Sequence, residues 1–275
     1  MWTPEGSEGF AIRNPASAFD EENLGGADEC IPTISPCLWR GKNLPDHGEA
    51  WSLSWSLNEA ALAQHVIATD VYLPISGLSM RRSVSLHGGE VLLDYELENR
   101  SEREVEYIWA FHPDFSIVEG DRIEMPSDCA WFQTEVALGC PLGPRGAKWR
   151  WPDPIPGISL DRLDFEQYNP AAIKLFTQPL SIGYAAIRND RTGDMLALHF
   201  DPSLHDTVGI WLTQGGWRGH HHLALEPTNG APDALDVAVT DWKRFATIMP
   251  REVRRWQIRM VLSASSASTA ESPSQ

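Results

Sequence analysis

Basic side chains are scarce in this chain. Its 275 residues hold 22 Lys and Arg against 38 Asp and Glu, a formal net charge of −16 at pH 7. Nucleic acids and anionic membranes are bound by basic patches, so this balance argues against both as partners. No apolar run approaches the length of a membrane-spanning helix. The first residues, MWTPEGSEGF, lack the basic and apolar regions of a secretory signal, which predicts a cytoplasmic protein.

Cysteine is also rare, and its spacing excludes two further classes of protein. None of the four cysteines stands in the CxxC spacing of structural zinc sites and redox motifs. In a cytoplasmic protein such residues are expected to be reduced thiols. The sequence therefore predicts no disulfide framework and no metal site. The four residues are Cys30, Cys37, Cys129 and Cys140.

Helical periodicity is missing as well. No 3.6-residue apolar repeat persists long enough to predict more than a few short helices. Instead, about a dozen short apolar or alternating runs are separated by turns rich in Gly, Pro, Asn and Asp. Two of these runs, 83–86 and 91–97, flank His87-Gly-Gly-Glu90 and predict a hairpin. We expect an all-β fold, a large antiparallel β-sandwich of two sheets.

The strand-like runs predict a single domain over residues 1–262. Residues 1–30 are rich in Gly, Pro and acidic side chains and are expected to form an irregular N-terminal arm. Residues 263–275, SASSASTAESPSQ, have low complexity and are expected to form a disordered tail.

Two apolar runs each end in an ionisable residue followed by proline, at His112-Pro113 and at Glu226-Pro227. Carboxylates seldom lie in an apolar strand unless a partner satisfies their charge. Proline holds the residue before it in an extended conformation, so both side chains are expected to be fixed at strand ends. A histidine and a carboxylate that meet in this way form a general acid–base pair, while a structural role for each is the alternative.

Other conspicuous residues are weaker evidence for a functional site. The three consecutive histidines at 220–222 cannot converge on one ion, because neighbours on a strand point to opposite faces. No G-x-S-x-G sequence and no phosphate-binding glycine loop is present. The twelve tryptophans fit a large β core, and they equally fit flat platforms for sugar rings. Asp46-His47-Gly48-Glu49 is a further cluster of polar residues that precedes a predicted strand.

Two motifs in this order resemble the aldose 1-epimerase (galactose mutarotase-like) superfamily. They are IWAFHPDF at 108–115, which contains His112, and LALEPTNGAPD at 223–233, which contains Glu226. Asp46-His47-Gly48 is similar to an earlier histidine–glycine motif of the family, and the resemblance extends over about residues 25–262. It implies a large antiparallel β-sandwich, the galactose mutarotase-like supersandwich.

The resemblance also implies roles for individual residues. Glu226 matches the general base and His112 the general acid, which is protonated, of a reaction that opens the sugar ring and closes it to the other anomer. His47 matches a residue that contacts the sugar near its ring oxygen. Trp211, Gln214 and Arg40 fall where family members bind the sugar. For the aspartate that binds sugar hydroxyls, Asp161 and Asp164 are both open as matches.

The expected activity is that of an aldose 1-epimerase-like isomerase that needs no cofactor. The expected partner is a small-molecule sugar, a free hexose or related aldose. A non-catalytic carbohydrate-binding or regulatory protein on the same fold is the alternative. Within the enzyme class, a phosphorylated sugar is a further alternative as substrate, with Arg40, Lys42 and Arg218 as candidate phosphate ligands.

Overall fold

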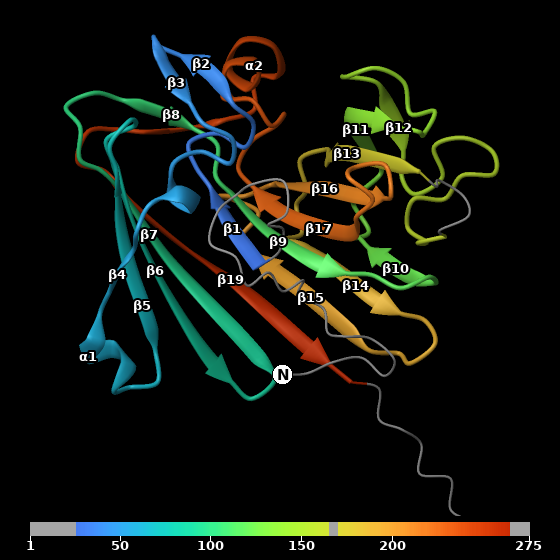
Figure 1. Ribbon diagram of the computed structural model, residues 1–275, viewed down its shortest axis with the longest axis horizontal. Coiled ribbons are helices and arrows are strands. Elements are labelled where there is room, and N and C mark those ends of the chain that lie inside the picture. The colour runs from blue at the N-terminus through green and yellow to red at the C-terminus, as the bar shows by residue number, and fades with distance from the viewer. Residues whose placement is uncertain (1–25, 165–169, 265–275) are drawn as a thin grey trace, which may run out of the picture.

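Two large antiparallel sheets make up most of the protein (Figure 1). The computed structural model describes residues 26–164 and 170–264. One sheet has seven strands in the order β1-β9-β17-β16-β13-β11-β12. Its strands are β1 (Gly26–Cys30), β9 (Ala110–Ser116), β11 (Trp131–Leu138), β12 (Lys148–Arg150), β13 (Ala171–Thr177), β16 (Thr207–Gln214) and β17 (His221–Thr228).

The other sheet has eight strands in the order β10-β14-β15-β19-β7-β6-β5-β4. Its strands are β4 (Ser56–Leu57), β5 (Ile67–Leu73), β6 (Leu78–His87), β7 (Glu90–Asn99), β10 (Asp121–Glu124), β14 (Tyr184–Asn189), β15 (Met195–Phe200) and β19 (Val253–Ser263).

Short elements connect and cover these sheets. Two further two-stranded sheets are formed by β2 (Cys37–Trp39) with β3 (Lys42–Leu44), and by β8 (Val105–Tyr107) with β18 (Ala246–Ile248). The helical segments are η1 (Ala50–Ser52), α1 (Glu59–Leu62), α2 (Leu235–Val237) and η2 (Ala238–Trp242). In the described part of the chain, no helix is long and apolar enough to cross a membrane.

The main core lies between the two large sheets and follows from the two-residue period of their strands. Alternate side chains such as Phe111, Leu223 and Leu225 of the seven-stranded sheet are buried in one cluster with Met80 and Leu97 of the eight-stranded sheet. Their strand neighbours point to the opposite face, away from the core. Apolar residues at every second position therefore fix which polar residues share the other face.

The predicted fold class is confirmed: large antiparallel sheets dominate, and the helices are few and short. The hairpin expected around Gly88 is present, because β6 ends at His87 and β7 begins at Glu90. Two boundaries differ from the prediction. Residues 26–30 are strand β1 and not part of an irregular arm, and Ser263 belongs to β19. Residues 1–25 and 265–275 lie outside the described residues.

Candidate active site

A cavity of about 630 Å³ lies on the face of the seven-stranded sheet that points away from the main core. Aromatic rings, cations and carboxylates all contribute to its wall. This mixture suits a ligand that carries both apolar faces and hydroxyl groups. The lining residues are Ile34, Ser35, Asp46, His47, Trp51, His112, Asp114, Lys174, Trp211, Trp217, Arg218, His222 and Asp233.

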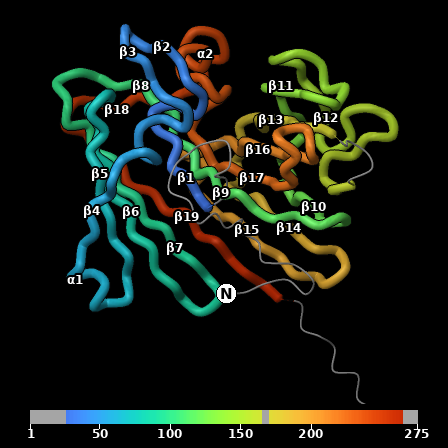
Figure 2. The backbone as a smooth tube through the Cα atoms, in the orientation of Figure 1, coloured from blue at the N-terminus to red at the C-terminus, as the bar shows by residue number. Residues whose placement is uncertain are grey.

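Five adjacent strands lie in the order β1-β9-β17-β16-β13 (Figure 2). They carry Asp28, His112, Glu226, Trp211 and Lys174, respectively. Asp28 of β1 is paired with His112 of β9, and Lys174 of β13 is paired with Trp211 of β16. Because β9 and β17 are neighbours, His112 Nε2 lies 3.2 Å from Glu226 Oε1. The two ionisable residues that precede prolines, far apart in the sequence, therefore meet as predicted.

Glu226 is fully buried on β17 and is not part of the cavity wall. Lys174 Nζ lies 2.6 Å from its Oε1 and 2.5 Å from its Oε2, and Lys174 itself faces the cavity. Gly209 leaves space for the carboxylate, since a Cβ there would stand 3.0 Å from Glu226 Oε2. Burial lowers the pKa of Lys174, but Asp233 and Glu226 raise it above its ordinary value. The expected base is thus covered by a charged ammonium group.

His112 faces the cavity from β9 in an environment that does not favour its protonated form. Burial lowers its pKa well below the ordinary value, and the positive charges of His47 and Lys174 lower it further. Its Nδ1 has no hydrogen-bond partner among the described residues and lies 3.8 Å from Asp114 Oδ1. These surroundings favour a neutral imidazole near neutral pH, in contrast to the protonated His112 that the resemblance implied.

His47 is the histidine of the cavity whose surroundings favour a positive charge. Its ring centroid lies 5.0 Å from that of His112, and its Nδ1 lies 2.9 Å from Asp28 Oδ2. Burial lowers the pKa of His47, but Cys30 and Asp28 more than offset this and raise it well above the ordinary value. Burial raises the pKa of Cys30 itself to about 11, so this thiol is uncharged near pH 7. Asp28 is therefore the anion that keeps the proton on His47.

The loop that carries His47 is held tightly against the segment after β1. His47 has φ 55° and Gly48 φ 71°, a left-handed conformation that histidine adopts more readily than most residues with a side chain. A Cβ on Gly48 would stand 2.0 Å from the carbonyl oxygen of Ile31, so this close approach requires glycine. The backbone N–H of His47 donates to the Ile34 carbonyl at 2.7 Å. The His-Gly sequence thereby fixes the imidazole at the cavity.

Two aspartates of the cavity wall each have a buried oxygen without a hydrogen-bond partner among the described residues. Asp114 Oδ1 and Asp233 Oδ1 accept no hydrogen bond from residues in the described ranges. Burial raises the pKa of Asp114 to about 7, and the negative charge of Asp28 adds to this effect. Burial also raises the pKa of Asp233, and Lys174 opposes that rise. Buried polar atoms are usually paired, so an unpaired oxygen on each of two residues of the cavity wall marks these carboxylates as candidate acceptors for a ligand.

Trp211 lies in the cavity wall beside His222. Its Nε1 donates to His222 Nε2 at 3.0 Å, which fixes both rings. Of the histidines at 220–222, His222 lines the cavity while His221 is exposed, in keeping with the alternation of a strand. No group of three or more His, Cys, Asp or Glu side chains within residues 26–164 and 170–264 is arranged to hold a metal ion.

Two residues that the resemblance placed near the sugar lie elsewhere. Arg40, in the turn between β2 and β3, pairs with Glu106 in a separate pocket of about 280 Å³. Gln214 is buried but does not line the cavity. It follows Trp211 by three positions on β16, and an odd separation on a strand places two side chains on opposite faces. Neither residue lines the cavity that contains His112 and His47.

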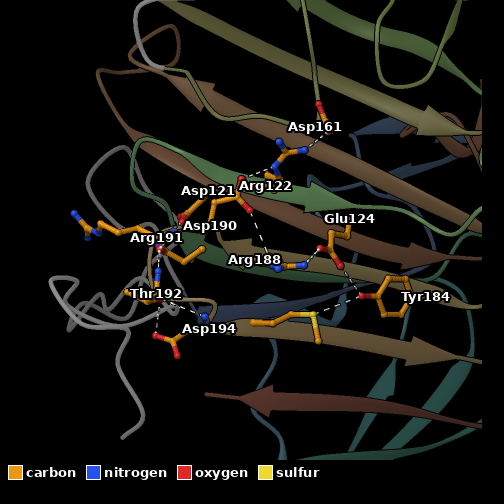
Figure 3. A network of polar contacts seen from close by, with 12 residues as sticks. Asp121, Arg122, Glu124, Asp161, Tyr184, Arg188, Asp190, Arg191, Thr192 and Asp194 are labelled. Atoms are coloured by element: carbon orange, nitrogen blue, oxygen red, sulfur yellow. Dashed lines mark hydrogen bonds and ion pairs between the residues drawn. The ribbon is translucent and has the colours of Figure 1, made fainter. Parts of the chain in front are cut away.

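The two aspartates considered for sugar hydroxyls are also outside the cavity wall. Asp161 accepts a hydrogen bond from Arg122 at 3.1 Å, and the same guanidinium pairs with Asp190, so Asp161 belongs to a polar network beside β10 and β14 (Figure 3). Asp164 lines a different pocket of about 510 Å³. The cavity instead presents Asp46, Asp114 and Asp233.

Lys174 and Asp28 are the site residues that the sequence analysis missed. Lys174 interrupts the apolar strand AAIKLFT, and this is the same signal that singled out Glu226 in LALEPT. A buried cation and a buried carboxylate in two apolar strands could have been paired on that ground. Asp28 could not be recognised from the sequence pattern, because its strand β1, GADEC, is short and lies within a segment rich in turn-forming residues.

Solved structures resemble this fold over most of its length. The Slr1438 protein from Synechocystis sp. PCC 6803 superposes with a TM-score of 0.64 at 17% identity, covering 88% of this chain and 79% of that one. A galactose mutarotase-like protein from Lactobacillus casei gives 0.65 at 16% identity, covering 86% and 85%. A galactose mutarotase related enzyme from Lactobacillus acidophilus gives 0.57 at 15% identity, covering 86% and 82%.

These similarities establish the galactose mutarotase-like fold that the two motifs implied. No protein-family model matches the sequence. No curated protein sequence matches it either. Because the identities are low, the activity has to be argued from the residues of the cavity.

Proposed function

We propose that this protein is an aldose 1-epimerase-like isomerase that interconverts the anomers of a free hexose or related aldose. One observation carries the proposal: a neutral imidazole and a cationic imidazole, His112 and His47, lie 5.0 Å apart at one cavity. Each is backed by a carboxylate, Glu226 and Asp28 respectively. Mutarotation needs a base for the anomeric hydroxyl and an acid for the ring oxygen, and these groups supply both.

In this scheme His112 takes the proton from the anomeric hydroxyl. Glu226, 3.2 Å from His112 Nε2, stabilises the imidazolium that forms. His47 gives a proton to the ring oxygen, so the ring opens to the aldehyde. Rotation about the bond to C1 and the reverse proton transfers close the ring to the other anomer. The roles differ from those that the resemblance implied, because Lys174 covers Glu226 and burial keeps His112 neutral.

The walls of the cavity fit the same substrate class. Trp51, Trp211 and Trp217 present aromatic rings on which the C–H face of a pyranose can lie. The carboxylates of Asp114 and Asp233 line the cavity, each with an unpaired oxygen, and can accept hydrogen bonds from sugar hydroxyls. A sugar needs both kinds of contact.

Anomer exchange measured by NMR on α-glucose and α-galactose tests the proposal. We expect wild-type protein to accelerate exchange, and Glu226→Gln to reduce the acceleration by about 10²- to 10⁴-fold because the imidazolium loses its counter-ion. Glu106→Gln is the matched control: Glu106 is also buried and also pairs with a cation, Arg40, but in the other pocket. Its rate should equal that of wild type. Equal exchange rates with and without wild-type protein would exclude this activity for both sugars.

A carbohydrate-binding protein without catalysis is the second candidate. The contact between Lys174 and both oxygens of Glu226 favours it, because a carboxylate already paired with an ammonium group is less able to stabilise an imidazolium at His112. Calorimetry distinguishes the two functions. A sugar that binds with no acceleration of anomer exchange would establish the second candidate.

A further inference from the structure

Lys174 and Asp233 form a pair on the cavity wall that the proposed reaction does not use. Lys174 Nζ lies 3.3 Å from Asp233 Oδ1, and both residues line the cavity. The contact is an ion pair without the alignment of a hydrogen bond, because Asp233 Oδ1 accepts no hydrogen bond from any described residue. Asp233 is 8% exposed. A buried carboxylate oxygen beside an ammonium group, on a residue that lines the cavity, is therefore left without a hydrogen bond from the described residues.

We propose that Lys174 and Asp233 determine sugar specificity by binding one hydroxyl group of the ligand between them. The ammonium group donates to the hydroxyl oxygen, and the hydroxyl donates to Asp233 Oδ1. The inference rests on the proposed function in one respect, namely that the cavity takes a sugar. It does not depend on which residue transfers the protons.

The geometry of the pair matches the chemistry of a hydroxyl. A hydroxyl is both donor and acceptor, so it satisfies a cation and a carboxylate together. Two atoms 3.3 Å apart can both lie within hydrogen-bond distance of one oxygen. A methylene group at the same place would leave Asp233 Oδ1 buried and unpaired, which is unfavourable. The pair therefore favours a sugar that carries a hydroxyl at this position over its deoxy analogue.

Both partners are held in place before a ligand arrives. Glu226 contacts Lys174 Nζ through both carboxylate oxygens and fixes the end of a long side chain. The backbone carbonyl of Asp233 accepts hydrogen bonds from the N–H groups of Ile34 at 2.9 Å and Ser35 at 3.0 Å. The end of the Lys174 side chain and the backbone of Asp233 are thus fixed before binding, and such preorganisation strengthens discrimination. Glu226 thus supports this pair as well as His112.

A panel of monodeoxy sugars tests the pair by binding alone. Calorimetry on the wild-type protein compares glucose and galactose with analogues that lack one hydroxyl each. We expect one position at which the deoxy sugar binds about 10- to 100-fold more weakly, from the usual effect of an unpaired buried charged group. Asp233→Leu keeps the branching at Cγ and removes the acceptor. It should reduce that ratio to about 1, on the same reasoning.

Two further variants keep the test decisive. Lys174→Met combined with Glu226→Gln removes both charges of the buried pair, so no charge is left alone, and it should weaken discrimination at the same position. Asp46→Leu is the matched control, since Asp46 also lines the cavity but has no ion pair with Lys174 among the described residues. It should leave the ratio at that position as in wild type.

The outcomes separate this inference from the proposed function. If wild type discriminates at no single hydroxyl, or if Asp233→Leu retains the wild-type ratio, the pair does not determine specificity, whatever the rate of anomer exchange. If discrimination follows the pair but no sugar is interconverted, the inference stands and the isomerase proposal falls. If no sugar of the panel binds, both are overturned.

Discussion

Two buried glutamates of this protein differ in what surrounds them. Glu29, on β1, accepts hydrogen bonds from Tyr95 at 2.8 Å, Trp109 at 2.9 Å and Arg82 at 3.1 Å. Glu226, on β17, pairs with Lys174 and lies beside His112. Both carboxylates are almost inaccessible to solvent, and both have a cation as partner.

The difference lies in the neighbours. The donors around Glu29 satisfy both of its oxygens, and Tyr95 and Trp109 belong to the core between the large sheets. Around Glu226, His112 Nδ1 and Asp233 Oδ1 have no hydrogen-bond partner among the described residues, and both residues border the cavity. A buried carboxylate is therefore not in itself a sign of function. Polar atoms without hydrogen-bond partners beside a buried carboxylate, in residues that line a cavity, are a more informative sign of a functional site.

The largest effect on stability is expected at Glu29, because its hydrogen-bond partners stabilise the fold and none of them lines the cavity. Glu29→Leu would leave Tyr95, Trp109 and Arg82 without their acceptor, so we expect the free energy of unfolding to fall by about 5 kcal/mol. Anomer exchange per folded molecule should not change, because none of these residues lines the cavity. Urea unfolding measures the first quantity. A loss below about 1 kcal/mol would show that the network is not structural.

A smaller, pH-dependent effect is expected at Asp114. Burial raises the pKa of this carboxyl in the folded protein to about 7, from 3.8. The folded state binds the proton more tightly, so the contribution of Asp114 to stability is complete below about pH 4 and is lost as the pH rises to about 7. Relative to wild type, Asp114→Asn should gain about 2–4 kcal/mol in free energy of unfolding between pH 4 and pH 7.5.

Urea unfolding of both proteins at the two pH values checks this prediction. The difference between the proteins has to be compared, because His205 and His222 act in the opposite direction. Burial lowers their pKa values to about 3 and about 4, so their contribution to stability grows as the pH rises toward 6.5. A parallel pH dependence of wild type and Asp114→Asn would contradict the assignment to Asp114.

The sequence could predict the fold class from local patterns, and the family resemblance implied that His112 and Glu226 share one site. Apolar alternation defines the strands, but the expected strand ends at the two prolines were wrong: β9 continues past Pro113 to Ser116, and β17 continues past Pro227 to Thr228. The charge states could not be predicted in this way. The neutral state of His112 depends on burial and on Lys174, and the charge of His47 depends on Asp28, a residue of another strand. Those contacts exist only in three dimensions.

Trp211 and Gln214 show a different limit. Both were placed at the sugar by resemblance, yet the period of two on a strand already puts them on opposite faces. The structure has Trp211 in the cavity wall and Gln214 buried away from it. The strand periodicity already placed Gln214 on the face opposite to Trp211, but the match to a family position was given precedence over it.

The smallest effect is expected at Arg40, the residue that the resemblance placed near the sugar. Its guanidinium pairs with Glu106, and its turn lies at a pocket that shares no lining residue with the cavity. Arg40→Gln should therefore leave anomer exchange and sugar affinity at wild-type values. Stability should fall by at most about 1 kcal/mol, because the Arg40 side chain is 53% exposed and solvent weakens its ion pair. Exchange kinetics and calorimetry on the same preparation measure both. A tenfold loss of sugar affinity would place the ligand at the second pocket. The distinction between Glu226 as a site residue and the other buried carboxylates as structural residues would then be wrong.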